Sequence, residues 1–299
     1  MFIENHRRRA LVGAAGAALL ALSLAACGDK AADDDAPDAP KATADAALAA
    51  KVPDAIKADG VIKVGTDATY APAEFLDTDG KTVVGFDIDL FNAVAAKLGL
   101  EAQYESAPFD AILPGIESGK YEIGVSSFTI NEDRKKTVNM VSYFSAGTQW
   151  ATKAGNPSGI NPDDACGKKV AVQVGTVQLD DITARSKACT DAGKPEITID
   201  QYQAQSDATA AVISGKDDAM LADSPVGAYA VKQSNNQLEL LGDIYESAPY
   251  GYAVAKDQAE FAAVVQEALA AIVADGTYEK VLAEWGVEAG GIAESAVNP

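Results

Sequence analysis

The sequence predicts an α/β protein built from two similar lobes, each a largely parallel sheet flanked by helices. Two observations lead to this prediction. From Val61 onward, short apolar runs end at glycine or a turn and are followed by amphipathic stretches, the order of strand, turn and helix. The same order restarts at Lys169, although the residues of the two halves are not identical. Strands that alternate with helices through short connections are typical of parallel sheets.

Both halves contain the same kinds of element. Asp87 is the expected N-cap of a helix that ends at Leu98, and Asp79-Gly80 predicts a turn between two short extended pieces. The expected strands are 61–64, 121–125, 169–174, 197–199 and 218–223. The expected helices are 87–98, 109–119, 131–137, 177–188, 208–214, 261–274 and 278–285.

Residues 1–26 have the composition of a secretory signal peptide. Three arginines at 7–9 precede an apolar stretch at 10–26, and the sequence Leu-Ala-Ala-Cys closes this stretch at Cys27. Cleavage by an ordinary signal peptidase, with Cys27 incidental, is the alternative. The Leu-Ala-Ala-Cys sequence resembles the lipobox of bacterial lipoproteins, which implies that Cys27 becomes a lipidated first residue. Two or more acyl chains there would give stable anchoring on the outer face of the cell membrane.

Residues 27–54 are expected to form a disordered acidic tether. The segment is rich in Ala, Asp and Pro, has three consecutive aspartates at 33–35, and contains almost no large apolar residue. Such a segment cannot bury enough surface to offset its loss of conformational entropy. A helix around 45–51 is the alternative for its final part.

The chain is strongly acidic, with 44 Asp and Glu, 24 Lys and Arg and a formal net charge of −20. Loss of residues 1–26, which carry three arginines and one glutamate, makes the charge more negative still. Because such a surface repels phosphate groups, no nucleic-acid partner is expected.

Two cysteines, Cys166 and Cys189, remain if Cys27 is lipidated. In an oxidising compartment two cysteines most simply pair, and a disulfide closing a loop of this length stabilises a fold by roughly 3 kcal/mol. Two buried free thiols are the alternative.

The residues favour binding over catalysis. The only histidine, His6, lies in the segment that export would remove, so the exported chain has no histidine base. No G-x-S-x-G elbow, P-loop or dinucleotide glycine fingerprint is present. No cofactor is expected. A metal site is poorly supported as well, because the exported chain would have no histidine and only the two thiols of Cys166 and Cys189.

The richest polar cluster runs from 126 to 134, where a strand gives way to a helix. Arg134 can grip both oxygens of a carboxylate, and Ser127 and Thr129 can complete the shell. The alternative is a capping segment in which Arg134 pairs with Glu132 or Asp133 on the surface.

Other candidates lie at the ends of strands. The turn at Thr176 and Val177 offers backbone amides to the same carboxylate. Asp223 ends a strand and can pair with an ammonium group, or alternatively cap the helix that follows. Three aromatic residues can sandwich a ligand side chain, or alternatively belong to the core. They are Tyr70, Phe109 and Phe128.

Together these residues resemble the family 3 solute-binding proteins of ABC importers for polar amino acids. Gly-Phe-Asp-Ile-Asp-Leu at 85–90, with its continuation to Leu98, matches the family signature. Further similar segments follow in the family's order and are 66–72, 126–134, 173–176 and 274–278. The resemblance extends over about 61–285.

The resemblance implies a type II periplasmic-binding-protein-like fold, with two lobes joined by two hinge segments near 147–150 and 250–252. The expected division is a signal peptide at 1–26, a tether at 27–54, lobe 1 at 55–147 and 252–292, and lobe 2 at 148–251. It also implies a monomeric receptor, periplasmic or anchored outside the cell membrane, that delivers its ligand to an ABC permease.

The resemblance also assigns roles to individual residues. Arg134 would hold the α-carboxylate with Thr129 and the Thr176-Val177 turn. Asp223 and Ser127 would hold the α-amino group. The remaining roles concern the ligand side chain, which Tyr70 and Phe109 would flank and whose tip Asp67 would reach. Relatives often carry Thr or Gly at the position of Val177, so only the backbone amide of Val177 is expected to bind ligand.

Two other functions stay open at this point. One is an enzyme like the cyclohexadienyl dehydratases, for which Glu74 or Asp110 is the candidate acid. The other is a receptor that reports its ligand to a membrane kinase. Asp67, the aromatic residues and the acidity favour a cationic amino acid such as arginine or lysine, while glutamine or a zwitterion such as ectoine are alternatives.

Overall fold

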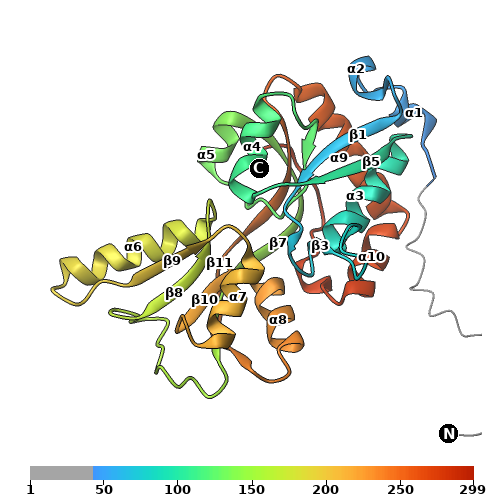
Figure 1. Ribbon diagram of the computed structural model, residues 1–299. Coiled ribbons are helices and arrows are strands. Elements are labelled where there is room, and N and C mark those ends of the chain that lie inside the picture. Colours follow the sequence, from blue (N-terminus) through green and yellow to red (C-terminus); the bar gives the residue numbers. More distant parts are fainter. Residues whose placement is uncertain (1–42) are drawn as a thin grey trace, which may run out of the picture. The chain divides into compact units, whose positions relative to one another are not determined.

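The computed structural model describes residues 43–299 (Figure 1). The predicted signal peptide, the predicted lipidation site Cys27 and most of the predicted tether lie outside the described residues. Within residues 43–299, no helix is both long enough and apolar enough to cross a membrane.

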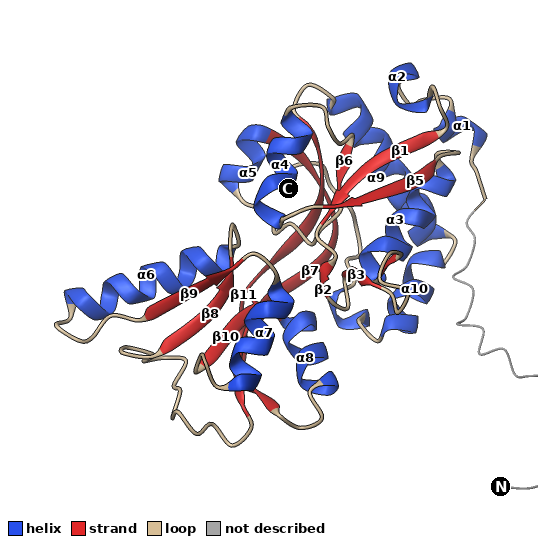
Figure 2. Cartoon of the chain, in the orientation of Figure 1, coloured by secondary structure: helices blue, strands red, loops and turns tan. Residues whose placement is uncertain are grey.

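Helices and strands alternate along the described chain (Figure 2). The helices are α1 (Ala46–Ala49), α2 (Asp54–Lys57), α3 (Phe86–Lys97), α4 (Phe109–Glu117), α5 (Glu132–Thr137), α6 (Val177–Asp191), α7 (Gln205–Ser214), α8 (Ser224–Gln233), α9 (Ala259–Ala274), α10 (Thr277–Trp285) and the 3₁₀ helix η1 (Glu288–Gly290). The strands are β1 (Val61–Thr66), β2 (Thr69–Tyr70), β3 (Glu74–Leu76), β4 (Val83–Val84), β5 (Glu101–Ser106), β6 (Ile123–Gly124), β7 (Val138–Lys153), β8 (Lys169–Gln173), β9 (Thr198–Tyr202), β10 (Ala219–Asp223) and β11 (Leu238–Ala255).

Eight strands form one hydrogen-bonded sheet in the order β5-β1-β6-β11-β7-β10-β8-β9. Strands β5, β1 and β6 are parallel to one another, and so are β10, β8 and β9. The first set packs against α3 and α4, with α9 beside α3 and against β7 and β11, and the second set packs against α6, α7 and α8. We call these two assemblies lobe 1 and lobe 2. Strands β2, β3 and β4 form a small separate sheet beside α3.

The two long strands β7 and β11 join the lobes. They pair with each other in antiparallel fashion, and the pairing shifts register between Leu241 and Tyr245, between Tyr245 and Ala248, and again after Tyr250. Gly147 lies in this stretch, where a Cβ atom would be 2.6 Å from the carbonyl oxygen of Tyr245. Because β7 and β11 run through both lobes, the two expected sheets are continuous with each other.

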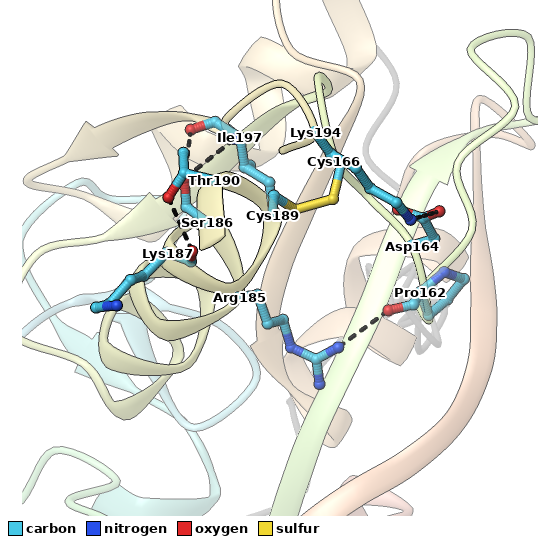
Figure 3. Close-up of a disulfide and its surroundings, with 10 residues drawn as sticks. All are labelled: Pro162, Asp164, Cys166, Arg185, Ser186, Lys187, Cys189, Thr190, Lys194 and Ile197. Carbon is cyan, nitrogen blue, oxygen red and sulfur yellow. Dashed lines mark hydrogen bonds and ion pairs between the residues drawn. A yellow bond between two sulfur atoms is a disulfide. The ribbon is translucent and has the colours of Figure 1, made fainter. Parts of the chain in front are cut away.

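Each lobe has an apolar core, and the core of lobe 1 extends to Ala222 and Val226 in β10 and α8 of lobe 2. In lobe 1, α3 and α9 bury residues such as Phe91 and Val265 against the sheet, and lobe 2 packs around Trp150 and Ile182. The disulfide between Cys166 and Cys189 borders the core of lobe 2 (Figure 3). It ties the loop before β8 to the last turns of α6, which confirms the predicted pairing.

Residues 43–54, at the end of the predicted tether, are folded against lobe 1. Asp45 caps α1 by accepting a hydrogen bond from the N–H of Ala47 at 2.8 Å. Leu48 and Val52 are buried in the core of lobe 1, next to α9. The helix that was the alternative for this stretch is therefore present. Burial of these two apolar side chains holds it against lobe 1.

One predicted cap is wrong. The N-cap position of α3 is Gly85, and Asp87 lies inside the first turn with its side chain fully buried. A strand at 101–106 was not predicted from the sequence. This strand, β5, lies at the edge of the sheet, and polar residues alternate along it instead of forming an apolar run.

Candidate ligand-binding site

Residues from both lobes line one pocket at the carboxyl ends of the parallel strands. Asp67 directly follows β1, Thr176 is the N-cap of α6, and Asp223 is the last residue of β10. Every predicted ligand residue except Phe128 lines this pocket, together with Gln173 and Gln178. The lining residues are Asp67, Tyr70, Phe109, Ser127, Thr129, Arg134, Gln173, Thr176, Val177, Gln178 and Asp223.

Arg134 spans the gap between the lobes. Its Nη1 donates to the carbonyl oxygen of Thr129 at 2.8 Å, and its Nη2 donates to that of Gly175 at 3.1 Å. The guanidinium lies over the rings of Phe109 and Phe128, 5.4 and 5.5 Å from their centroids. Burial lowers the pKa of Arg134 to about 10, so the group stays positive at neutral pH.

The surface ion pair that was the alternative for Arg134 is not found. Glu132 pairs with Lys135 at 2.7 Å, and Asp133 pairs with Lys136 at 2.6 Å. Within residues 43–299 no carboxylate lies within 4 Å of the Arg134 guanidinium. A half-buried cation held only by carbonyl oxygens and aromatic rings can take an anion in the pocket.

Asp223 is a buried carboxylate held by neutral donors. Its Oδ2 accepts from the Tyr70 hydroxyl at 2.9 Å, and its Oδ1 accepts from Gln178 Nε2 at 2.9 Å. Its side chain makes no capping hydrogen bond to α8, so the capping alternative does not hold. Burial raises the pKa of Asp223, while its hydrogen-bond donors and the charge of Arg134 oppose the rise.

Asp67 is also buried, and its partner, like Tyr70 for Asp223, belongs to the other lobe. Gln173 Nε2 donates to Asp67 Oδ2 at 2.5 Å and to the carbonyl oxygen of Gln203 at 2.9 Å. Burial raises the pKa of Asp67 to about 6, against the opposing effect of its donors. A neutral amide therefore contacts a carboxylate that a cation would satisfy better.

The aromatic residues divide into two groups. Phe109 and Tyr70 line the pocket. Phe128 stacks on Phe109 with their centroids 4.8 Å apart, and it is only 1% exposed. It therefore supports Phe109 from the core, as its alternative interpretation has it, and does not line the pocket.

Two pocket residues, Gln173 and Gln178, were not predicted from the sequence as ligand residues. Gln173 ends β8 after three apolar residues and is 2% exposed, and Gln178 is the second residue of α6 and is also 2% exposed. The sequence pattern that could have revealed them is a glutamine on each side of the Gly-Thr turn, each with an apolar residue immediately before and after it.

The model of the bacterial extracellular solute-binding proteins, family 3, matches residues 62–288. The chain belongs to this family. The arginine-binding protein ArgT of Corynebacterium glutamicum is 37% identical to this family 3 protein over 252 residues, which are 84% of this chain and 82% of ArgT.

Solved structures agree with the fold. An ancestral arginine-binding protein bound to arginine is 37% identical, with a TM-score of 0.69, and the match covers 76% of this chain and 98% of that one. An ancestral arginine-binding protein bound to glutamine is 35% identical, with a TM-score of 0.70 and coverage of 77% and 99%. The predicted α/β periplasmic-binding-protein fold is therefore confirmed, and the protein is a solute-binding protein rather than an enzyme.

Proposed function

We propose that this protein captures a cationic amino acid, with arginine the best candidate, between its two lobes and delivers it to an ABC permease. The observation that carries this proposal is a pocket with one unpaired guanidinium, from Arg134, and two buried carboxylates, from Asp67 and Asp223. A cationic amino acid carries the complementary set, one carboxylate and two cations.

Each charged group of the ligand then has a partner. The α-carboxylate binds Arg134, assisted by Thr129 and the amides at Thr176 and Val177. The α-ammonium group binds Asp223 and Ser127. Because Asp223 is buried and Arg134 is half-buried, the ligand replaces lost hydration with direct ion pairs, and closure of the lobes keeps water out.

The side chain of the ligand passes Tyr70 and Phe109 and ends at Asp67. An ion pair at Asp67 favours a guanidinium or ammonium tip, whereas a neutral amide would gain only a hydrogen bond. The names of ArgT and of the arginine-bound ancestral protein agree with this choice, and the glutamine-bound ancestral protein makes glutamine the second candidate.

The proposal extends to the N-terminal segment. Residues 1–26 act as a signal peptide, Cys27 carries the lipid, and the following acidic segment keeps the monomeric receptor near its permease in the outer face of the membrane. The support is the Leu-Ala-Ala-Cys sequence at 24–27 and the extracellular family. Metabolic labelling with a palmitate analogue tests it, with Cys27→Ala as the unlabelled control.

The two acids that were candidates for the dehydratase alternative, Glu74 and Asp110, do not line the pocket, and Glu74 is buried beneath Ser126. We therefore put no enzyme activity forward.

A thermal-shift screen over the twenty amino acids tests the proposed function. A ligand present at 100 times its dissociation constant stabilises a receptor by about 2.7 kcal/mol. Arginine is expected to give the largest rise in melting temperature, followed by lysine. A screen in which no amino acid raises the melting temperature contradicts the proposal.

A further inference from the structure

Two carboxyl groups, Glu74 and Asp87, lie buried together beneath the pocket. Glu74 belongs to β3 and Asp87 to the first turn of α3, and both side chains are fully buried. Their side chains are close enough to affect each other's pKa, and within residues 43–299 neither has a lysine or arginine within 4 Å. Neither group lines the pocket, so direct ligand contact does not account for them.

The pair holds one proton at neutral pH. Two adjacent carboxylates without a counter-ion repel each other, and burial disfavours both charges. Burial and the charge of Asp87 raise the pKa of Glu74 well above its usual range. The pKa of Asp87 is raised less, to about 6, because several donors surround it. Glu74 therefore keeps the proton and Asp87 carries the negative charge.

Asp87 uses its carboxylate to hold Ser127. Its Oδ2 accepts from the Ser127 N–H at 2.9 Å, from the Ser127 hydroxyl at 3.0 Å and from the Tyr143 hydroxyl. Its Oδ1 is buried and has no other donor within the described residues, which leaves it for the proton of Glu74. Glu74 Oε2 is 3.4 Å from the Ser127 hydroxyl, so Asp87 is the nearer acceptor.

This arrangement decides what Ser127 can offer to the pocket. A serine hydroxyl has one proton and two lone pairs, and the proton of Ser127 points to Asp87. The lone pairs then serve as acceptors. The backbone of Ser127 has a φ of +50°, in the left-handed region that costs energy for residues other than glycine, and the two hydrogen bonds to Asp87 hold it there.

The neighbouring serine links the same pair to Asp67. Ser126 Oγ donates to Glu74 at 3.0 Å and accepts from the Asp67 N–H at 3.0 Å. One buried pair thus fixes two consecutive serines below the pocket.

We infer that Glu74 and Asp87 are positioning residues that orient Ser127 as a hydrogen-bond acceptor for the α-ammonium group of the ligand. The inference rests on the proposed function, because it needs an amino acid in the pocket. It explains why an acid at the start of α3 is buried instead of capping the helix.

The test compares L-arginine with 5-guanidinopentanoate, which is arginine without its α-amino group. Isothermal titration calorimetry gives the dissociation constant of each ligand. The dissociation constant of 5-guanidinopentanoate divided by that of L-arginine, here called the ratio, measures recognition of the ammonium group alone. In Asp87→Ala the hydroxyl of Ser127 is free to rotate, so its lone pairs are no longer held toward the α-ammonium group of the ligand. We therefore expect the ratio to fall about tenfold, the effect of one hydrogen bond to a charged group. General damage to the fold weakens both ligands equally and leaves the ratio unchanged.

Conservative variants provide the controls. Asp87→Asn keeps an acceptor oxygen for Ser127, and Glu74→Gln keeps a donor for Asp87, so both are expected to retain the wild-type ratio within about threefold. Ser127→Ala, which leaves Glu74 and Asp87 intact, is expected to lose the same factor as Asp87→Ala, and the double variant no more than either.

The outcomes separate the inference from the proposed function. A wild-type ratio in Asp87→Ala or in Ser127→Ala overturns the inference. A ratio in Asp87→Asn that falls about tenfold also overturns it, and this variant provides the test if Asp87→Ala does not fold. If the wild type binds L-glutamine instead of L-arginine, L-glutamine and 4-carbamoylbutanoate replace the first two probes. Wild-type protein that binds neither amino acid contradicts the proposed function itself.

Discussion

The two ends of the pocket are built differently. At the end formed by Arg134 and Asp223, each protein charge has two neutral partners: backbone carbonyls for the guanidinium, and Tyr70 and Gln178 for the carboxylate. We call this the amino-acid end. At the side-chain end, the Asp67 carboxylate accepts from a single side-chain amide among residues 43–299, that of Gln173.

The difference matches what the ligands share and where they differ. Every α-amino acid has the same carboxylate and ammonium groups, so one set of partners at the amino-acid end suits all of them. Only the side chain varies, and a single carboxylate with a replaceable amide is enough to select its charge. Changes at the amino-acid end should therefore weaken all ligands, and changes at the side-chain end should alter selectivity.

The largest expected effect is at Arg134. Replacing it in Arg134→Ala leaves the ligand carboxylate buried without a cation, so the binding free energy of every amino acid should weaken by roughly 2–5 kcal/mol. Lys136→Ala, on the exposed side of the same helix, is the matched control and should bind as the wild type. Calorimetry measures both, and an unchanged dissociation constant in Arg134→Ala would remove this residue from the site.

A smaller and selective effect is expected at Asp67. Asp67→Asn removes one charge with little change in shape, so arginine affinity should fall by about 1–3 kcal/mol, while the affinity for glutamine should change little. The unliganded variant should also melt at a higher temperature, because the buried carboxylate is costly at neutral pH. Equal losses for arginine and glutamine would contradict the division between the two ends.

The pH dependence of binding follows from the same residue. The pKa of Asp67 is about 6 in the unliganded fold, and a bound cation lowers it, so binding releases a proton near this pH. Arginine affinity should therefore decrease as the pH falls from 7.5 to 5, by at most about tenfold per pH unit. The dependence over this range should be weaker in Asp67→Asn, and a wild-type affinity that stays flat would argue against an ionised Asp67 at the ligand tip.

The stability of the unliganded protein should depend on pH with the opposite sign. The folded-state pKa of Asp67 lies above its ordinary value, so its contribution to stability improves as the pH falls from about 6 towards 4.

The smallest effect on affinity is expected at the disulfide. Cys166 and Cys189 lie outside the pocket, so replacing both with serine should lower the free energy of unfolding by roughly 3 kcal/mol and leave the dissociation constant within about twofold. Chemical denaturation and calorimetry on the same sample check both parts. A large loss of affinity would mean that the disulfide shapes the pocket.

The sequence predicted the amino-acid end of the pocket better than the side-chain end. Arg134, Thr176 and Asp223 each lie where a strand gives way to a helix, a local pattern that a single segment reveals. Gln173 could not be paired with Asp67 in advance, because the two residues are 106 positions apart and meet only when the lobes come together.

The same physical limit explains the other differences. β7 and β11 continue through the predicted hinge segments because they pair with each other, and no local pattern records a partner about a hundred residues away. Asp87 has the side chain and position of a helix cap, yet the burial of Glu74, Ser127 and Tyr143 around it gives it another role. Long-range contacts, rather than local preference, decided these cases.

The most direct test of the account compares L-arginine with L-citrulline, its neutral analogue of nearly the same shape. Both ligands engage Arg134 and Asp223 alike, so calorimetric titration of the wild-type protein isolates the charge at the side-chain end. We expect arginine to bind at least about tenfold more tightly, the contribution of one charge-assisted pair with Asp67. Equal affinities, or tighter binding of citrulline, would contradict the claim that this pocket selects a cationic amino acid.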